Sequence, residues 1–133
     1  MTTVLTRLSA AQLASGLAGQ ALAVARRAYY DIPFGTGRPE DVVRDSFTNG
    51  TAFSAPVHML VLQGWATRRL ARRPGDVLAR RVLRGLGAVM VAGSLMERRN
   101  RQRLTPGGAD PVETPLVVTA VGLSAAMALA GRR

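Results

Sequence analysis

Long stretches without a charged residue are the feature that most constrains how this chain can fold. Its 18 arginines and eight acidic residues are gathered in five groups, which leave four charge-free windows between them. The windows hold 18, 22, 12 and 18 residues and run over Leu8 to Ala25, Ser46 to Thr67, Gly85 to Met96 and Thr114 to Gly131. A helix in water needs polar residues every three or four positions to keep its outer face hydrated. The pattern therefore predicts an all-α protein, a small transmembrane helical bundle that forms a single domain over residues 1–133.

The basic excess agrees with a membrane location. All the basic residues are arginines and the net charge is +10, and the mean hydropathy is only +0.11 because these arginines lower the average over otherwise apolar windows. A soluble nucleic-acid-binding protein is the alternative that such a charge suggests. The arginines, however, flank the apolar windows, where anionic lipid headgroups lie. We therefore expect a lipid bilayer with anionic headgroups as the partner, and no nucleic acid.

Four membrane spans and one long loop are expected. The spans cover about 8–25, 51–67, 82–97 and 114–131, and the loop 29–50 contains a short helix at about 39–47. The third span is the weakest, since its 12 uncharged residues make only about 18 Å of helix. Three spans plus a re-entrant or interfacial segment are the alternative. Four are favoured because a glycine-rich apolar stretch packs well in a bundle and four helices close a core more completely.

The arginines also indicate how the chain is oriented. The segment Arg68–Arg84 holds seven arginines and a single acid, Asp76. By the positive-inside rule this connection faces the cytoplasm. A basic set made of arginine alone, beside many alanines, glycines and valines, is typical of a bacterium with GC-rich DNA. We therefore expect a multi-pass protein of the bacterial inner (plasma) membrane.

The second window holds the single histidine of the chain, His58. Ser54 and His58 are four residues apart and Trp65 is seven beyond His58, so a helix places these three side chains on one face. Ionisable side chains at membrane depth rarely face lipid, and we expect that face to point into the bundle. Gln63 lies nearer to Met59 on the same helix.

The aromatic residues suggest where a ligand could bind. All six lie between positions 29 and 65, so the first loop could fold over the second span and enclose an apolar ligand, with His58 as polar anchor. An aromatic belt at one membrane interface is the alternative explanation. The predicted ligand-binding residues are Tyr29, Tyr30, Phe34, Phe53, His58, Gln63 and Trp65.

Few residues offer catalytic or metal-binding chemistry. The chain has no cysteine and one histidine, too few for a sulfur or imidazole ligand set, so we expect no metal and no cofactor. Histidine is the residue type whose ordinary pKa lies near neutral pH, which makes His58 a candidate acid or base, and an acid of the first loop, Asp31, could act with it. These two are the catalytic candidates. A hydrogen-bonded histidine inside the bundle and a solvated acidic loop are the simpler explanations.

These features favour binding or assembly over catalysis. We expect a small multi-span membrane protein that acts as an accessory or assembly subunit, or that binds a hydrophobic ligand. Packing through small residues would suit a homo-oligomer or a larger membrane complex. The alternative is a membrane-embedded enzyme that acts on a lipid or isoprenoid with His58 as acid or base.

Overall fold

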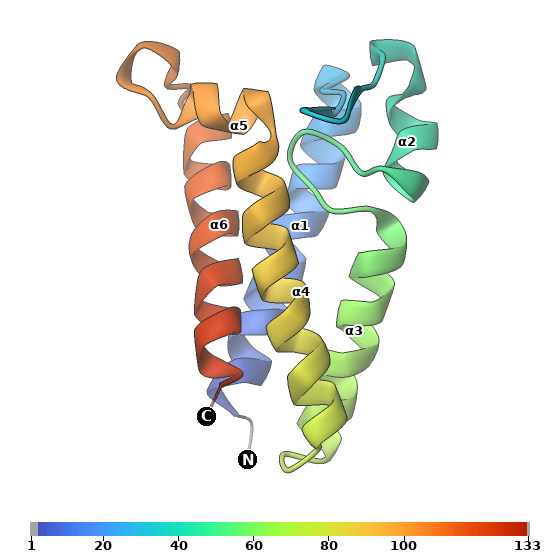
Figure 1. Ribbon diagram of the computed structural model, residues 1–133, viewed down its shortest axis with the longest axis vertical. Coiled ribbons are helices and arrows are strands. Elements are labelled where there is room, and N and C mark those ends of the chain that lie inside the picture. The colour runs from blue at the N-terminus through green and yellow to red at the C-terminus, as the bar shows by residue number, and fades with distance from the viewer. Residues whose placement is uncertain (1–2, 133) are drawn as a thin grey trace.

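Four long helices form an antiparallel bundle. The computed structural model describes residues 3–132, and Figure 1 shows the helices running alternately up and down. They are α1 (Val4–Arg26), α3 (Val57–Arg72), α4 (Val77–Met96) and α6 (Glu113–Ala130). Each packs on two neighbours, in the ring order α1, α3, α4, α6. The all-α class and the helical bundle predicted from the sequence are confirmed.

Short elements cover one end of the bundle. At the lower end of Figure 1 lie the tight turn between α3 and α4 and the first and last described residues. The upper end carries a two-stranded antiparallel hairpin and several short helices. These are β1 (Asp31–Ile32), β2 (Gly35–Thr36), the 3-10 helix η1 (Pro39–Asp41), α2 (Val42–Thr48), α5 (Arg98–Arg103) and the 3-10 helix η2 (Pro106–Gly108). η1 and α2 occupy the part of the first loop in which the sequence predicts a short helix.

Two of the long helices begin at other positions than the charge-free windows suggest. α3 starts only at Val57, directly after Pro56, and continues past its window into the arginines. α4 starts at Val77, because the Asp76 side chain accepts a hydrogen bond from the Ala79 N–H and caps the helix. The 20 residues of α4 make about 30 Å of helix. α4 therefore runs the length of the bundle and does not turn back (Figure 1).

The polarity of the two faces of α1 is the reverse of that in a water-soluble bundle. Its outward face is apolar, with several alanines and with Leu17 56% exposed. In water, the hydrophobic effect places the apolar face inward and the polar face outward. The opposite distribution is typical of a helix surrounded by lipid. The polar or very small residues on its buried face are Thr6, Ser9, Gln12, Ser15, Gly16 and Gly19.

The buried face of α1 meets a polar network in the middle of the bundle. Gln63 of α3 is fully buried, and its amide donates to the Gln12 side-chain oxygen at 2.8 Å and to the Ser9 carbonyl at 3.1 Å. The Gln12 amide donates to Ser124 Oγ of α6 at 3.2 Å, and the Ser9 and Thr67 hydroxyls are 2.7 Å apart. Buried polar groups are costly unless they are paired. The network therefore fixes α1, α3 and α6 relative to one another.

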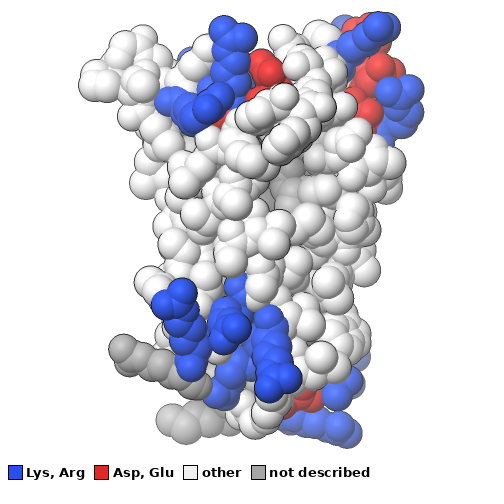
Figure 2. Space-filling model, in the orientation of Figure 1, with Lys and Arg blue, Asp and Glu red and all other residues white. Residues whose placement is uncertain are grey.

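Charged residues lie at the two ends of the molecule, and an uncharged belt separates them (Figure 2). Belt side chains such as Leu17, Val61 and Val118 are 56%, 66% and 53% exposed. Among the helices of residues 3–132, α1 and α6 are long and apolar enough to cross a membrane. Only 22% of the most apolar 18-residue stretch of α6 is buried. Most residues of this apolar helix are therefore at least partly exposed, unlike those of a core helix of a soluble protein.

Candidate ligand-binding site

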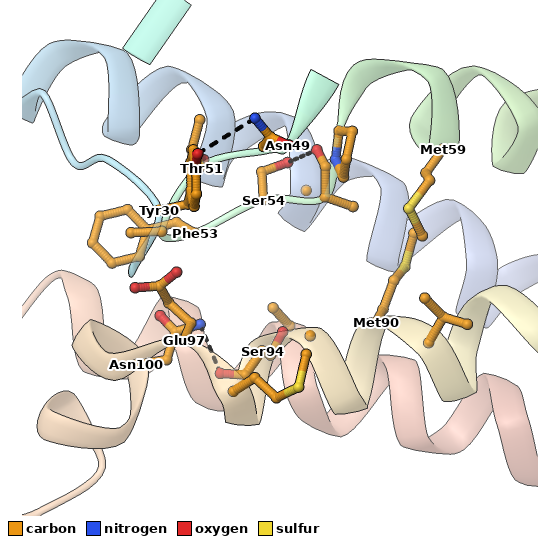
Figure 3. Close-up of a pocket in the computed structure, with 18 of the residues that line it drawn as sticks. Tyr30, Asn49, Thr51, Phe53, Ser54, Met59, Met90, Ser94, Glu97 and Asn100 are labelled. Carbon is orange, nitrogen blue, oxygen red and sulfur yellow. Dashed lines mark hydrogen bonds between the residues drawn. The ribbon is translucent and has the colours of Figure 1, made fainter. Parts of the chain in front are cut away.

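A cavity of about 150 Å³ lies in the upper half of the bundle, between α1, α3, α4 and the segment 49–56 (Figure 3). Figure 2 shows the surface hollowed just below the charged upper end, within the uncharged belt. An engineered apolar cavity of similar volume in another protein admits benzene. The space here therefore suits a head group and a few carbon atoms rather than a whole lipid.

Close backbone contacts hold the segment 49–56 over α1. Gly19 lies directly against the Phe53 carbonyl, so that a Cβ at this position would overlap the Phe53 backbone. The Ala52 N–H donates at 3.1 Å to a backbone carbonyl just after α1. Gly50 has a φ of 85°, a conformation that glycine adopts without strain, and it turns the chain toward α3. One wall of the cavity is therefore backbone that is fixed to α1.

Polar side chains gather at the upper end of the cavity. The Glu97 carboxylate is 3% exposed and accepts hydrogen bonds from the backbone N–H groups of Asp31, at 2.9 Å, and Arg99. Burial raises the pKa of Glu97 from 4.5 to about 7, and these hydrogen bonds offset only part of the rise. Glu97 can therefore hold or lose a proton near neutral pH. The polar residues that Figure 3 shows at this end are Tyr30, Asn49, Thr51, Glu97 and Asn100.

The opposite end of the cavity is apolar. Met59 and Leu60 of α3 line it together with Val89 and Met90 of α4, and Figure 3 shows the two methionines pointing toward each other. Methionine side chains are flexible and adapt to ligands of different shape. Gly93 of α4 also lines the cavity, and a Cβ added there would meet no atom within 4 Å. The cavity thus has a polar and an apolar end, arranged along the bundle.

The residues that the sequence predicts as ligand-binding lie at several different places in the structure. Tyr30 and Phe53 line the cavity. Tyr29 lies in a neighbouring polar pocket with residues of α5, and Phe34 is 84% exposed on the β1–β2 hairpin. Gln63 belongs to the polar network in the bundle core. The first loop and the second span thus contribute to the cavity, but through fewer aromatic side chains than expected.

His58 and Trp65 face outward, so the expectation that their side of the helix points into the bundle is wrong. Gln63 finds its hydrogen-bond partners on α1, which fixes its own side of α3 inward. His58 lies about 140° away from Gln63 around the helix and therefore points out. Its ring nitrogen is 3.3 Å from the Phe47 carbonyl of α2. The buried residues of α3 are Leu60, Gln63, Ala66 and Leu70.

The two catalytic candidates have separate surroundings. The Asp31 carboxylate accepts a hydrogen bond from the Thr36 hydroxyl at 3.1 Å and lies 3.8 Å from Arg98. The His58 ring contacts α2. Within residues 3–132, no hydrogen bond joins Asp31 to His58, and His58 does not line the cavity.

Sequence reasoning missed the polar residues that α4 and α5 bring to the cavity. Glu97 and Asn100 are more than 30 positions from the aromatic segment, and only the bundle brings them beside Tyr30. Glu97 follows a charge-free window and precedes a run of arginines, a pattern that favours a membrane boundary or an ion pair. An acid that ends an apolar helix was the signal that could have pointed to it.

No family model, no curated protein and no solved structure matches this chain. Among residues 3–132, no group of three or more histidine, cysteine or acidic side chains is placed to hold a metal ion. The functional argument therefore rests on the cavity and on the surface of the bundle.

Proposed function

We propose that this protein is a four-span membrane protein that binds a single-chain amphiphile in the cavity between α1, α3 and α4. The polarity of the cavity carries this proposal. It is polar near the charged end of the bundle, apolar toward the middle, and open at the uncharged belt. An amphiphile in a bilayer is arranged in the same way, with its head at the interface and its chain in the hydrocarbon.

The surface of the bundle supports a bilayer around the belt. α1 exposes apolar residues and buries polar ones, and most residues of the apolar helix α6 are at least partly exposed. α3 and α4 have shorter uncharged stretches, which end in arginines at the lower end. Long arginine side chains can reach the headgroups while their stems remain in hydrocarbon. Four antiparallel helices of this kind would give four spans.

The arginines support a lower end in the cytoplasm. The segment Arg68–Arg84 forms the end of α3, the turn and the start of α4, and it places seven arginines there against Asp76 alone. At the upper end, by contrast, three arginines are ion-paired to Glu113. A connection between two spans that holds more arginines than acids favours the cytoplasmic side of a bacterial inner membrane. The cavity would then lie near the outer surface of that membrane.

Filling the cavity is expected to weaken ligand binding strongly. Gly93→Phe places a ring in the cavity, since a Cβ at Gly93 meets open space. Protein in lipid nanodiscs would be offered dodecylamine, dodecanol, dodecanoate and methyl dodecanoate separately, and the bound compound measured by native mass spectrometry. We expect the wild type to bind at least one of them in a one-to-one complex. The affinity of Gly93→Phe should be lower by at least about ten-fold.

Gly85→Phe is the matched control for this test. Gly85 lies on the same helix, a Cβ there also meets open space, and it does not line the cavity. The control should bind like the wild type. Wild-type protein that binds none of the four compounds, or a Gly93→Phe variant that binds as well as Gly85→Phe, would refute the proposal.

Ligand binding has more support than the catalytic alternative. An acid–base role for His58 needs this side chain beside the bound ligand. The exposed position of His58, outside the cavity, does not favour such a role.

A further inference from the structure

The buried polar atoms that lack a partner at the cavity can accept hydrogen bonds. The Asn100 side chain is 4% exposed, and its Nδ2 donates to the Ser94 carbonyl at 3.1 Å. This contact fixes the orientation of the amide, because a carbonyl can only accept. Asn100 Oδ1 has no partner among the described residues and lies beside the Glu97 carboxylate (Figure 3). Thr51 Oγ1, 7% exposed, also lacks a partner there.

No cationic side chain of residues 3–132 lines the cavity, and the donors still free at this end are the hydroxyls of Thr51 and Tyr30, which can also accept. The Ser54 hydroxyl donates to the Ala55 carbonyl at 3.2 Å, and the Asn49 amide donates to the Tyr30 hydroxyl at 3.5 Å. A carboxylate or phosphate head would therefore meet the Glu97 side chain with no arginine among the lining residues, since Arg98, Arg99 and Arg103 line the neighbouring pocket. Anions bind where arginine, lysine or several N–H groups converge. This cavity instead offers the Glu97 carboxylate and Asn100 Oδ1, which accept hydrogen bonds.

We infer that the head group of the ligand is a hydrogen-bond donor, a primary ammonium or a hydroxyl, and that Glu97 and Asn100 receive it. The inference rests on the proposed function, because it specifies the head of the amphiphile in the same cavity. A primary ammonium has three N–H donors, which match the Glu97 carboxylate, Asn100 Oδ1 and Thr51 Oγ1. A hydroxyl donates one hydrogen bond and can accept another from the Tyr30 hydroxyl.

The protonation of Glu97 suits such a head group. Its pKa of about 7 lets the side chain remain uncharged in the empty cavity or carry a charge when a cation arrives. An ammonium beside the carboxylate favours the ionised form, so binding would lower this pKa. The hydrogen bonds from the Asp31 and Arg99 backbone then hold the carboxylate in place.

The four dodecyl compounds separate the head group from the chain. At about pH 8 the amine is charged, the acid is ionised, and the methyl ester accepts hydrogen bonds but cannot donate them. We expect dodecylamine and dodecanol to bind wild-type protein at least about ten-fold more tightly than dodecanoate and methyl dodecanoate. Affinities would be measured by titration and native mass spectrometry in the same nanodiscs.

Glu97→Gln tests the role of the carboxylate. The variant keeps the shape of the side chain, and it should weaken dodecylamine binding at least about ten-fold while changing dodecanol binding by less than about three-fold. Glu40→Gln, on the exposed surface, is the matched control and should leave both affinities unchanged. If Glu97→Gln does not fold, Thr51→Val is the second variant, with an expected loss of about three-fold for dodecylamine.

The outcomes distinguish this inference from the proposed function. Equal affinities for all four compounds, lost together in Gly93→Phe, would overturn the donor head group and leave chain binding intact. Tightest binding of dodecanoate would also overturn it. Absence of binding by every compound would remove both proposals.

Discussion

Replacing Gly87 by alanine is expected to destabilise the bundle by about 3 kcal/mol, at the upper end of the usual cost of overpacking. A Cβ on Gly87 would lie 2.6 Å from the Ser124 carbonyl oxygen and 2.8 Å from the Ala128 backbone nitrogen. Because these are backbone atoms of α6, the two helices would have to move apart along their whole contact. The free energy of unfolding would be measured by circular dichroism in mixed micelles with rising amounts of dodecyl sulfate.

Gly85→Ala provides the control two residues earlier on α4. A Cβ at Gly85 meets open space, and alanine is the better helix former, so we expect this change to be neutral or to stabilise by up to about 1 kcal/mol. The changes in the free energy of unfolding caused by Gly87→Ala and Gly85→Ala should therefore have opposite signs or at least very different sizes. Equal losses at both positions would contradict the close packing of α4 on α6.

Replacing Glu113 by glutamine is expected to cost about 2 to 3 kcal/mol of stability. Glu113 is 1% exposed at the start of α6 and lies 2.5 Å from Arg26, 2.7 Å from Arg99 and 3.1 Å from Arg103. Glutamine keeps the shape but removes the charge, so three guanidinium groups of α1 and α5 would face one another without an acid. Breaking a fully buried pair costs about 3 to 5 kcal/mol. The loss here is smaller because the arginines can turn toward water.

Glu40→Gln again serves as the control, since Glu40 is exposed in η1. It should change the free energy of unfolding by no more than about 0.5 kcal/mol in the same micelles. A loss at Glu113 that is no larger than the loss at Glu40 would show that the Glu113 ion pairs do not hold α1, α5 and α6 together.

The long helices could be predicted because charge marks where they lie along the chain. The window 8–25 lies within α1, and 114–131 nearly coincides with α6. Charge is a poor guide to where α3 and α4 begin. The start of α3 depends on Pro56, and the first turns of α4 depend on the Asp76 cap, both of which are local features that a charge pattern does not detect.

The face of α3 that points inward could not be predicted from its own sequence. Between Val57 and Thr67 every side of this helix is uncharged, so the pattern does not choose between His58 and Gln63. The choice is made by Gln12 on α1, which pairs with Gln63. Tertiary contacts of this kind decide which polar residue is buried.

The cavity could not be predicted from the sequence for a related reason. Its walls come from the segment 49–56 and from α1, α3, α4 and α5, and no local stretch contains both ends. Tyr30 and Phe53 of the aromatic segment line the same cavity. Glu97 and Met90 join them only because α4 runs antiparallel to α3.

The proposed function depends on hydrocarbon surrounding the uncharged belt. The chain has no native cysteine, so single nitroxide labels can be placed through introduced cysteines. Leu17, Val61, Ala88 and Val118 are exposed belt positions, one on each long helix. Gly75 and Gly107 lie near the two ends, where a Cβ meets open space.

Collision of these labels with oxygen and with a water-soluble nickel complex, in lipid bilayers, would locate each helix. Oxygen concentrates in hydrocarbon and the nickel complex is excluded from it. We expect all four belt labels to collide mainly with oxygen, and the labels at Gly75 and Gly107 mainly with nickel. Nickel that reaches the belt positions as readily as the two ends would show that the belt lies in water, and the bundle would then not span a membrane.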